Sequence, residues 1–187
     1  MIWVMVPPIL SACRPGGLAV ALVLALALPA AAQTKPQASP AAAPPVTVSG
    51  VGVAMSGDLL TVSGSSVRLY GIAAPMAGET CLTRYSVTYD CYRHATDVLQ
   101  TLIGSAPVSC VITTTDRNGQ QVGVCRVGGT DLAAALVARG WAFAYRRLTP
   151  VYVGAEAFAE SHRLGMWAGK IEMPWQWRTR QLSNTAR

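Results

Sequence analysis

The sequence has few of the residues that build transition-metal centres. It contains two histidines, His94 and His162, and no pair of cysteines spaced as Cys-x-x-Cys. A structural zinc site needs four nitrogen or sulfur ligands, and neither histidine stands at a ligand spacing from a cysteine. These absences argue against a zinc site.

Lysine is also rare, because 13 of the 15 basic residues are arginine. Arginine presents a planar fork of donors that suits bidentate contacts with phosphate. The excess of basic over acidic residues, 15 against 9, is a weak indication of a polyanion partner such as nucleic acid or an anionic envelope surface. A protein that is merely kept soluble by its charge is the alternative.

Residues 1–32 have the pattern of a secretory signal peptide. Gly17–Leu28 contains only small and apolar residues, Arg14 precedes it, and alanines at 30–32 offer the small residues that a signal peptidase requires. The stretch 16–32 has 17 residues, at the short end of a membrane span, so an uncleaved anchor is the alternative. Cleavage would leave 14 basic against 9 acidic residues, a net charge of +5.

The rest of the chain divides into a linker, a domain and a tail. Residues 33–45 are rich in proline and alanine and predict a solvated linker. The folded domain is expected at 46–178 and a short tail at 179–187. The signal predicts a periplasmic or secreted protein, with membrane contact only through the signal or an uncleaved anchor.

Four cysteines follow the signal segment, and an even number in an exported chain predicts two disulfides. Cys81 and Cys91 flank a short loop before a predicted helix. Cys110 and Cys125 lie on two predicted strands joined by a glycine-containing turn, where they can face each other. We therefore predict the pairs Cys81–Cys91 and Cys110–Cys125.

The pattern of apolar residues predicts an α+β domain. Alternating apolar and polar positions indicate five short strands, at 46–55, 59–62, 67–72, 108–115 and 121–127. Helical spacing and capping residues indicate three helices, at 92–103, at 132–139 and from the N-cap Thr149 to about Leu164. The order lacks a βαβ alternation and any repeat, and it fits a five-stranded antiparallel barrel of the OB type with three helices.

Motifs along this domain resemble those of the staphylococcal-nuclease-like (thermonuclease) family. The stretch 56–76, SGDLLTVSGSSVRLYGIAAPM, is similar to the active-site hairpin of that family, and DRNGQ at 116–120 stands where the family has an Asp-x-x-Gly-Arg turn. The segments 131–142 and 155–167 resemble two of its helical motifs. The resemblance covers 51–177 and implies the fold of the family and a nucleic acid or other polyanion as partner.

The resemblance also implies an active site, of which the sequence keeps only part. The family hydrolyses phosphodiesters with a metal ion, two aspartates, one glutamate and two arginines. Asp58 stands at the first metal-binding aspartate and Arg68 at the first phosphate-binding arginine. The second aspartate, the glutamate base and the second arginine are replaced by Ala73, Met76 and Gln120.

These replacements predict little hydrolysis. Ca²⁺ takes roughly six to eight oxygen ligands, so Asp58 alone makes an incomplete metal site. Loss of a positioned base costs about 10²–10⁴ in rate, and loss of one transition-state donor about 10²–10³. Glu79 is the only nearby acid that could substitute. A local ion pair between Asp58 and Arg68 is as good an interpretation as a phosphate-binding role for Arg68.

Arg117, Tyr145 and Arg146 are the expected substrate-binding residues. Tyr145 and the two arginines after it follow the second predicted helix, near the place where the family contacts its substrate. An aromatic ring beside arginines suits stacking of a base and binding of a phosphate. A solvated basic loop is the alternative interpretation.

Three functions are compatible with these patterns. The first is an exported thermonuclease-like pseudoenzyme, catalytically silent or very weak, that binds a polyanion or a protein. The second is an active metal-dependent phosphodiesterase that uses Asp58 and Arg68, with Ca²⁺ as its expected cofactor. The third is an envelope interaction module without a role in nucleic-acid binding. The three replaced residues favour the first function.

Overall fold

A computed structural model describes residues 44–185 of the chain. The predicted signal peptide at 1–32 and all but the last two residues of the predicted linker lie outside this range. Among the helices of the described range, none has both the length and the hydrophobicity that crossing a bilayer requires.

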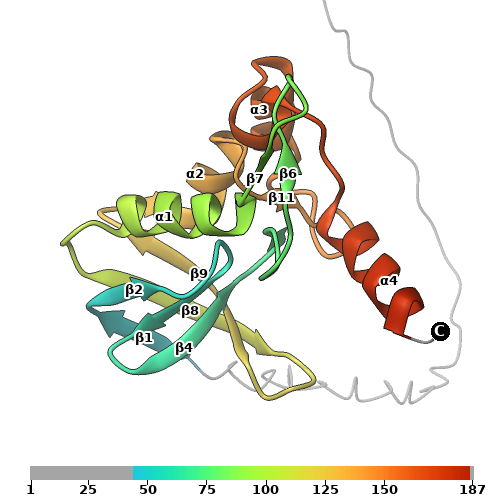
Figure 1. Ribbon diagram of the computed structural model, residues 1–187. Helices are drawn as coiled ribbons and strands as arrows, with labels where there is room; N and C mark the ends of the chain where they lie inside the picture. Colours follow the sequence, from blue (N-terminus) through green and yellow to red (C-terminus); the bar gives the residue numbers. More distant parts are fainter. Residues whose placement is uncertain (1–43, 186–187) are drawn as a thin grey trace, which may run out of the picture. The chain divides into compact units, whose positions relative to one another are not determined.

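A seven-stranded sheet forms the centre of the fold (Figure 1). The hydrogen-bonded order is β1-β8-β9-β4-β3-β2, and β10 pairs with β9 beside this path. The strands are β1 (Thr47–Gly50), β2 (Gly52–Ala54), β3 (Leu59–Val62), β4 (Ser65–Leu69), β8 (Val108–Thr115), β9 (Gln121–Val127) and β10 (Thr130–Asp131).

The sheet is not the closed barrel that the sequence predicts. Its ladder is an open path with β1 at one edge and β2 at the other, and within the described residues no backbone pairing joins these two strands. They are consecutive in the chain and separated by Val51 alone. The chain kinks at Gly50, whose φ of +146° is unfavourable for any other residue, and there it leaves β8 and goes on to pair with β3.

One pairing also departs from the expected antiparallel sheet, because β4 and β9 run parallel. A parallel pair needs a long crossover connection between its strands. Here the chain passes through α1 (Cys91–Ile103) and β8 before it returns to the edge of β4. This parallel pairing brings the start of β4 and the turn before β9 side by side.

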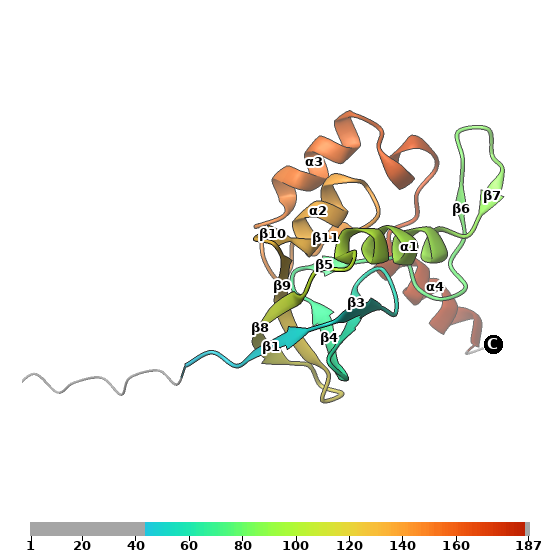
Figure 2. The same ribbon diagram turned by 90° about the vertical axis from the view of Figure 1, so that its left-hand side faces the viewer.

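Two small sheets hold the connections in place. β5 (Ile72–Ala73) pairs with β11 (Phe143–Ala144), and β6 (Cys81–Leu82) pairs with β7 (Thr88–Tyr89). The β6–β7 hairpin projects from the domain on the side away from β1, as Figure 2 shows. The first of these sheets ties the corner after β4 to the segment that follows α2 (Leu132–Ala138).

α1 and α2 lie close to their predicted positions, and each begins after an aspartate. The carboxylate of Asp90 or Asp131 accepts a hydrogen bond from a backbone N–H of the first turn. These caps satisfy donors that would otherwise lack a partner at the start of a helix.

α3 (Val153–Ser161) starts later and ends earlier than predicted. Thr149 does not cap it, because its hydroxyl accepts a hydrogen bond from Val151 N at 3.3 Å and closes a turn before the helix begins. The helix ends before Leu164 because Arg163 adopts a left-handed conformation, with φ of +51°.

Two further helical segments were not predicted from the sequence. They are the 3₁₀ helix η1 (Gly165–Ala168) and α4 (Pro174–Thr185), which runs through the predicted end of the domain at 178. Pro174 opens α4 at a position where its missing N–H has no helical partner to lose. α4 lies on the side of the domain away from β1 (Figures 1 and 2).

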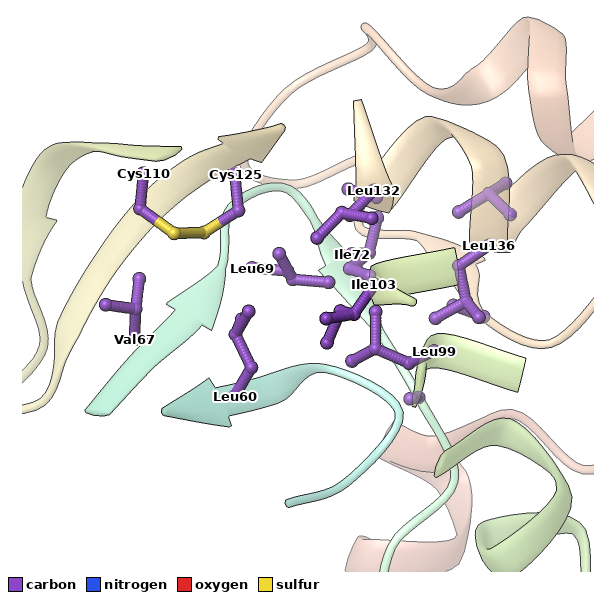
Figure 3. Packing of buried hydrophobic residues seen from close by; sticks show 14 of the residues in the cluster. Leu60, Val67, Leu69, Ile72, Leu99, Ile103, Cys110, Cys125, Leu132 and Leu136 are labelled. Carbon is purple, nitrogen blue, oxygen red and sulfur yellow. A yellow bond between two sulfur atoms is a disulfide. The ribbon is translucent and has the colours of Figure 1, made fainter. Parts of the chain in front are cut away.

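The main core lies between the sheet and the helices α1 and α2 (Figure 3). Its largest side chains are at most 1% exposed and come from strands and helices alike: Leu60, Leu69, Leu99, Ile103, Leu132 and Leu136. Both predicted disulfides are present, and the Cys110–Cys125 bond is buried within this core. Two disulfides in one domain fit an oxidising compartment.

We expect the Cys110→Ala/Cys125→Ala variant to lower the free energy of unfolding by about 3–4 kcal/mol, because it opens a loop and leaves a gap in the core. The cysteines are 15 residues apart and fully buried. Urea denaturation would measure the loss. The matched variant Cys81→Ala/Cys91→Ala, with a separation of 10 residues, should lose less, and a larger loss there would contradict the central role of the Cys110–Cys125 bond.

Candidate functional site

The β3–β4 hairpin carries the two residues that the sequence keeps. Arg68 lies opposite Leu59 in the ladder, and Leu69 N donates to Asp58 O at 2.8 Å. Arg68 Nη1 lies 2.8 Å from Asp58 Oδ2. Ser56 Oγ donates to the other carboxylate oxygen at 2.9 Å. Both oxygens of Asp58 are therefore held by donors of the protein itself.

A polar groove of about 530 Å³ opens beside Arg68, between β4 and the turn that joins β8 to β9. The Arg68 side chain is 39% exposed, and its contact with Asp58 uses one of its five N–H donors. The remaining donors are open to the groove. Other polar side chains that line it are Ser65, Ser66, Asp116, Asn118 and Gln120.

The turn at 116–120 is built by one carboxylate. Asp116 Oδ1 accepts hydrogen bonds from Asn118 N at 2.8 Å and from Gln120 N at 3.0 Å. Gly119 adopts a φ of +78° at the tip, which closes the turn. Arg117 is exposed on this turn, between the lining residues Asp116 and Asn118, and does not itself line the groove.

Gln120, at the position of the second arginine, is bound to β4. Its Nε2 donates to Ser66 O at 2.6 Å, and its Oε1 accepts from Ser66 Oγ at 3.2 Å. The carboxamide thus fastens the turn to the strand and supplies no positive charge to the groove.

The corner after β4 contains the other two replaced positions. Ala73 lies in β5 opposite Phe143 of β11. Met76 follows Pro75, and its Sδ lies 3.4 Å from Arg178 Nε of α4, a contact of a cation with a weak sulfur acceptor. Neither side chain carries an oxygen that could bind a metal ion.

Glu79 is buried in the same corner and is 2% exposed. Its Oε2 accepts a hydrogen bond from Met76 N at 2.9 Å, while Glu79 N donates to Met76 O at 2.8 Å. Burial raises the pKa of this carboxyl above its usual value of 4.5, and the Met76 hydrogen bond opposes that shift. The charges that also act on its pKa are Glu172, Arg180 and Arg178, all from the C-terminal segment.

Tyr145 and Arg146 line a different cavity, of about 570 Å³, which also includes residues of α3, η1 and α4. Glu156 Oε1 accepts from Ala144 N at 2.9 Å, and its Oε2 lies 2.6 Å from Arg146 Nη2. A carboxylate that is 4% exposed therefore holds Arg146. The structure brings Tyr145 and Arg146 together at this cavity, whereas Arg117 lies on the turn beside the first groove and lines neither cavity.

The sequence model of the family described as staphylococcal nuclease homologue matches residues 66–169, which is more than half of the chain. The chain belongs to the staphylococcal nuclease homologue family. Among curated proteins nothing matches the chain. The matched range contains β4, the groove, the corner and α1 to α3, and it ends before α4.

The donors at the site do not fit the Ca²⁺ ion on which this nuclease family typically depends. A Ca²⁺ site takes roughly six to eight oxygens, mostly from carboxylates. Asp58 is already bound by Arg68 and Ser56, and the next two positions are Ala73 and Met76. Within residues 44–185 no three histidine, cysteine or acidic side chains are grouped as a metal site.

Two features of these surfaces were missed by sequence reasoning. One is α4, whose signal was Pro174 followed by 11 residues without glycine or proline. The other is the ion pair between the buried Glu156 and the exposed Arg146. It gave no local signal, because the two residues are ten positions apart and meet only when α3 packs beside β11.

We expect Asp58→Ala and Arg68→Ala to be coupled by about 1 kcal/mol in a double-mutant cycle of unfolding free energies, because each replacement leaves the other charge without its partner. The coupling should fall when salt is raised, since both side chains are partly exposed. Ser56→Ala provides a control that keeps the ion pair. Additive effects of the two replacements would show that the pair does not stabilise the hairpin.

Glu79→Gln should flatten the pH dependence of stability. A raised pKa in the folded protein means that the contribution of Glu79 is complete below about pH 4.5 and is lost as pH rises through the folded pKa. Glutamine cannot ionise, so the variant should lose less stability than the natural chain between pH 4 and 7, measured by urea denaturation. Met76→Leu controls for local packing, and an equal loss in Glu79→Gln would contradict the burial effect.

Proposed function

We propose that this protein is an exported member of the nuclease family that binds a polyanion, with single-stranded nucleic acid as the first candidate, and does not hydrolyse it at a useful rate. The main observation behind this proposal is that the carboxylate of Asp58 is bound by other side chains of the protein. Its two oxygens are taken by Arg68 at 2.8 Å and Ser56 at 2.9 Å. The guanidinium of Arg68 offsets the charge of this carboxylate, and a single carboxylate supplies few of the roughly six to eight oxygens that Ca²⁺ takes.

The other groups needed for hydrolysis are also missing from their positions. Metal-assisted cleavage needs a base that activates water and donors that stabilise charge on the phosphoryl oxygens. Met76 cannot act as a base, and the amide of Gln120 is bound to Ser66. Glu79 does not replace them, because its carboxylate points to Met76 N inside the corner.

Polyanion binding is supported by the groove beside β4. Phosphate oxygens are bound by arginine, hydroxyl and amide donors, and these do not require a metal ion. The groove offers Arg68, the two serines at 65 and 66 and Asn118, and it also contains Asp116. Arg117 lies exposed on the adjoining turn. The net charge of +6 for the whole chain adds a long-range attraction for anions.

Export is supported by the two disulfides together with the apolar N-terminal segment. Disulfides of this kind persist in oxidising compartments. The pairs Cys81–Cys91 and Cys110–Cys125 both form within one domain. The signal pattern at 1–32 predicts the route to such a compartment.

We expect the natural chain to show no Ca²⁺-stimulated cleavage of single-stranded DNA, while the variant Ala73→Asp/Met76→Glu/Gln120→Arg gains at least about 10²-fold in rate. Cleavage would be followed on a labelled oligonucleotide with and without Ca²⁺. Asp58→Ala in both backgrounds is the control. Ca²⁺-dependent cleavage by the natural chain that Asp58→Ala abolishes would establish an active phosphodiesterase instead.

Binding should be measured on the same oligonucleotide across a range of salt concentrations. If several phosphates are neutralised, the logarithm of the association constant falls with slope of about −0.7 per phosphate contact. Arg117→Ala should reduce the slope by about one contact. Arg93→Ala, an exposed arginine of α1 outside the groove, is the matched control. An association constant that does not change with salt concentration would refute polyanion binding.

A further inference from the structure

The second cavity has a wall that lies outside the family match. Residues 66–169 match the family, whereas Met173, Trp175 and Thr179 of this wall come from the segment after them. The opposite wall carries Tyr145. The volume of about 570 Å³ falls within the range of roughly 300–1,000 Å³ that is usual for small-molecule pockets. The cavity is thus large enough for a ligand and is completed by α4.

Aromatic rings from both walls meet at this cavity. The ring centroids of Tyr145 and Trp175 are 6.4 Å apart, with an interplanar angle of 48°. Trp175 also stands edge-on to the buried Phe143, at 6.4 Å and 76°. This contact holds the indole in place, while 38% of Trp175 remains exposed. A fixed aromatic ring with an open face is a platform on which a flat ring can stack.

Some of the charged side chains that line the cavity form an ion pair with each other, and others do not. Arg146 is neutralised by the buried Glu156 and has a structural role. Arg147 and Glu160 also line the cavity, both are exposed, and neither has an ion-pair partner within residues 44–185. The cavity therefore offers one cationic donor and one anionic acceptor beside its aromatic platform. A bare anion would gain little here, because Glu160 opposes it.

We propose that this cavity is a nucleobase subsite, in which a base stacks on Trp175 with Tyr145 at its edge, while Arg147 binds the adjoining phosphate. Glu160 accepts a hydrogen bond from an exocyclic amino group, as carboxylates do with the N4 amino group of cytosine. The inference rests on the proposed binding of single-stranded nucleic acid. It adds a second contact point, built by α4, to the groove beside β4.

An anionic membrane is less suited to this surface than a nucleotide. A helix that lies in a membrane interface needs a broad exposed apolar face. In α4 the indole of Trp175 is turned to Phe143, and Trp177 is partly buried. Leu182, at 69% exposure, is the remaining large aliphatic side chain of the helix. A concave aromatic cavity fits a single base better than a flat bilayer.

The full-length protein should be titrated with deoxycytidine monophosphate, thymidine monophosphate and inorganic phosphate, observed through indole N–H signals in NMR. The nucleotides should shift the signals of Trp175 and Trp167, which both line the cavity. Inorganic phosphate at the same concentration should leave them unchanged. Equal shifts with phosphate, or no indole shift with either nucleotide, would overturn the proposal.

Three variants sharpen the test. Trp175→Ala should weaken nucleotide binding about tenfold, which is the usual scale for loss of one stacking contact, and Trp175→Phe should restore most of it. Glu160→Gln should reduce the preference for cytidine over thymidine. Trp177→Ala is the matched control, because Trp177 does not line the cavity. Thermal unfolding should confirm that each variant is folded. Unchanged affinity in Trp175→Ala would refute the stacking role.

Failure of this inference can be told apart from failure of the proposed function. In one outcome, Arg117→Ala changes the salt slope of oligonucleotide binding, whereas Trp175→Ala and Arg147→Ala leave it unchanged. This outcome would support binding in the groove and refute the subsite. In the reverse outcome, mononucleotides bind at Trp175 and Arg117→Ala has no effect on oligonucleotide binding. This outcome would support the subsite and refute binding in the groove. Vesicles of anionic lipid that shift Trp175 while nucleotides do not would favour a membrane partner.

Discussion

The ion pair between Asp58 and Arg68 is the contact that links the β3–β4 hairpin to the groove, because Arg68 takes part in both. It joins the start of β3 to β4, and β4 in turn lies between β3 and the parallel strand β9. The same contact occupies the one retained acid of the nuclease site. A pair of this kind contributes modest stability while both partners are present, yet removing one leaves a partly buried charge without its counter-charge. The pair therefore has a local structural role in the hairpin.

Each replaced position has acquired a packing role of its own. Ala73 lies in the β5–β11 pair, Met76 touches Arg178 of α4, and Gln120 ties its turn to Ser66. Neither Ala73 nor Met76 carries an oxygen in its side chain. These contacts connect the corner after β4 to the C-terminal segment, which also places Arg178 and Glu172 near the buried Glu79.

Much of the fold followed from local patterns. The spans of α1 and α2, the hairpin strands and both disulfide pairs were predicted, because apolar spacing, aspartate caps and paired cysteines act over short distances. The prediction of a closed barrel was wrong. The path of the chain at this point depends on a kink at Gly50, which no local sequence pattern indicates. The start of α3 was also wrong, because Thr149 bonds to Val151 in a turn instead of capping the helix.

For the candidate site, too, some features followed from the sequence and others only from the tertiary structure. The sequence by itself determined which chemical groups are available: one acid and one arginine of the nuclease set, with Ala73, Met76 and Gln120 at the other positions. Only the tertiary structure decided how they are used. It turned Asp58 and Arg68 to each other, set Arg68 and Tyr145 at separate cavities and added a wall from α4. Residue identity fixes the donors and acceptors, but their partners are chosen by contacts between segments far apart in the chain.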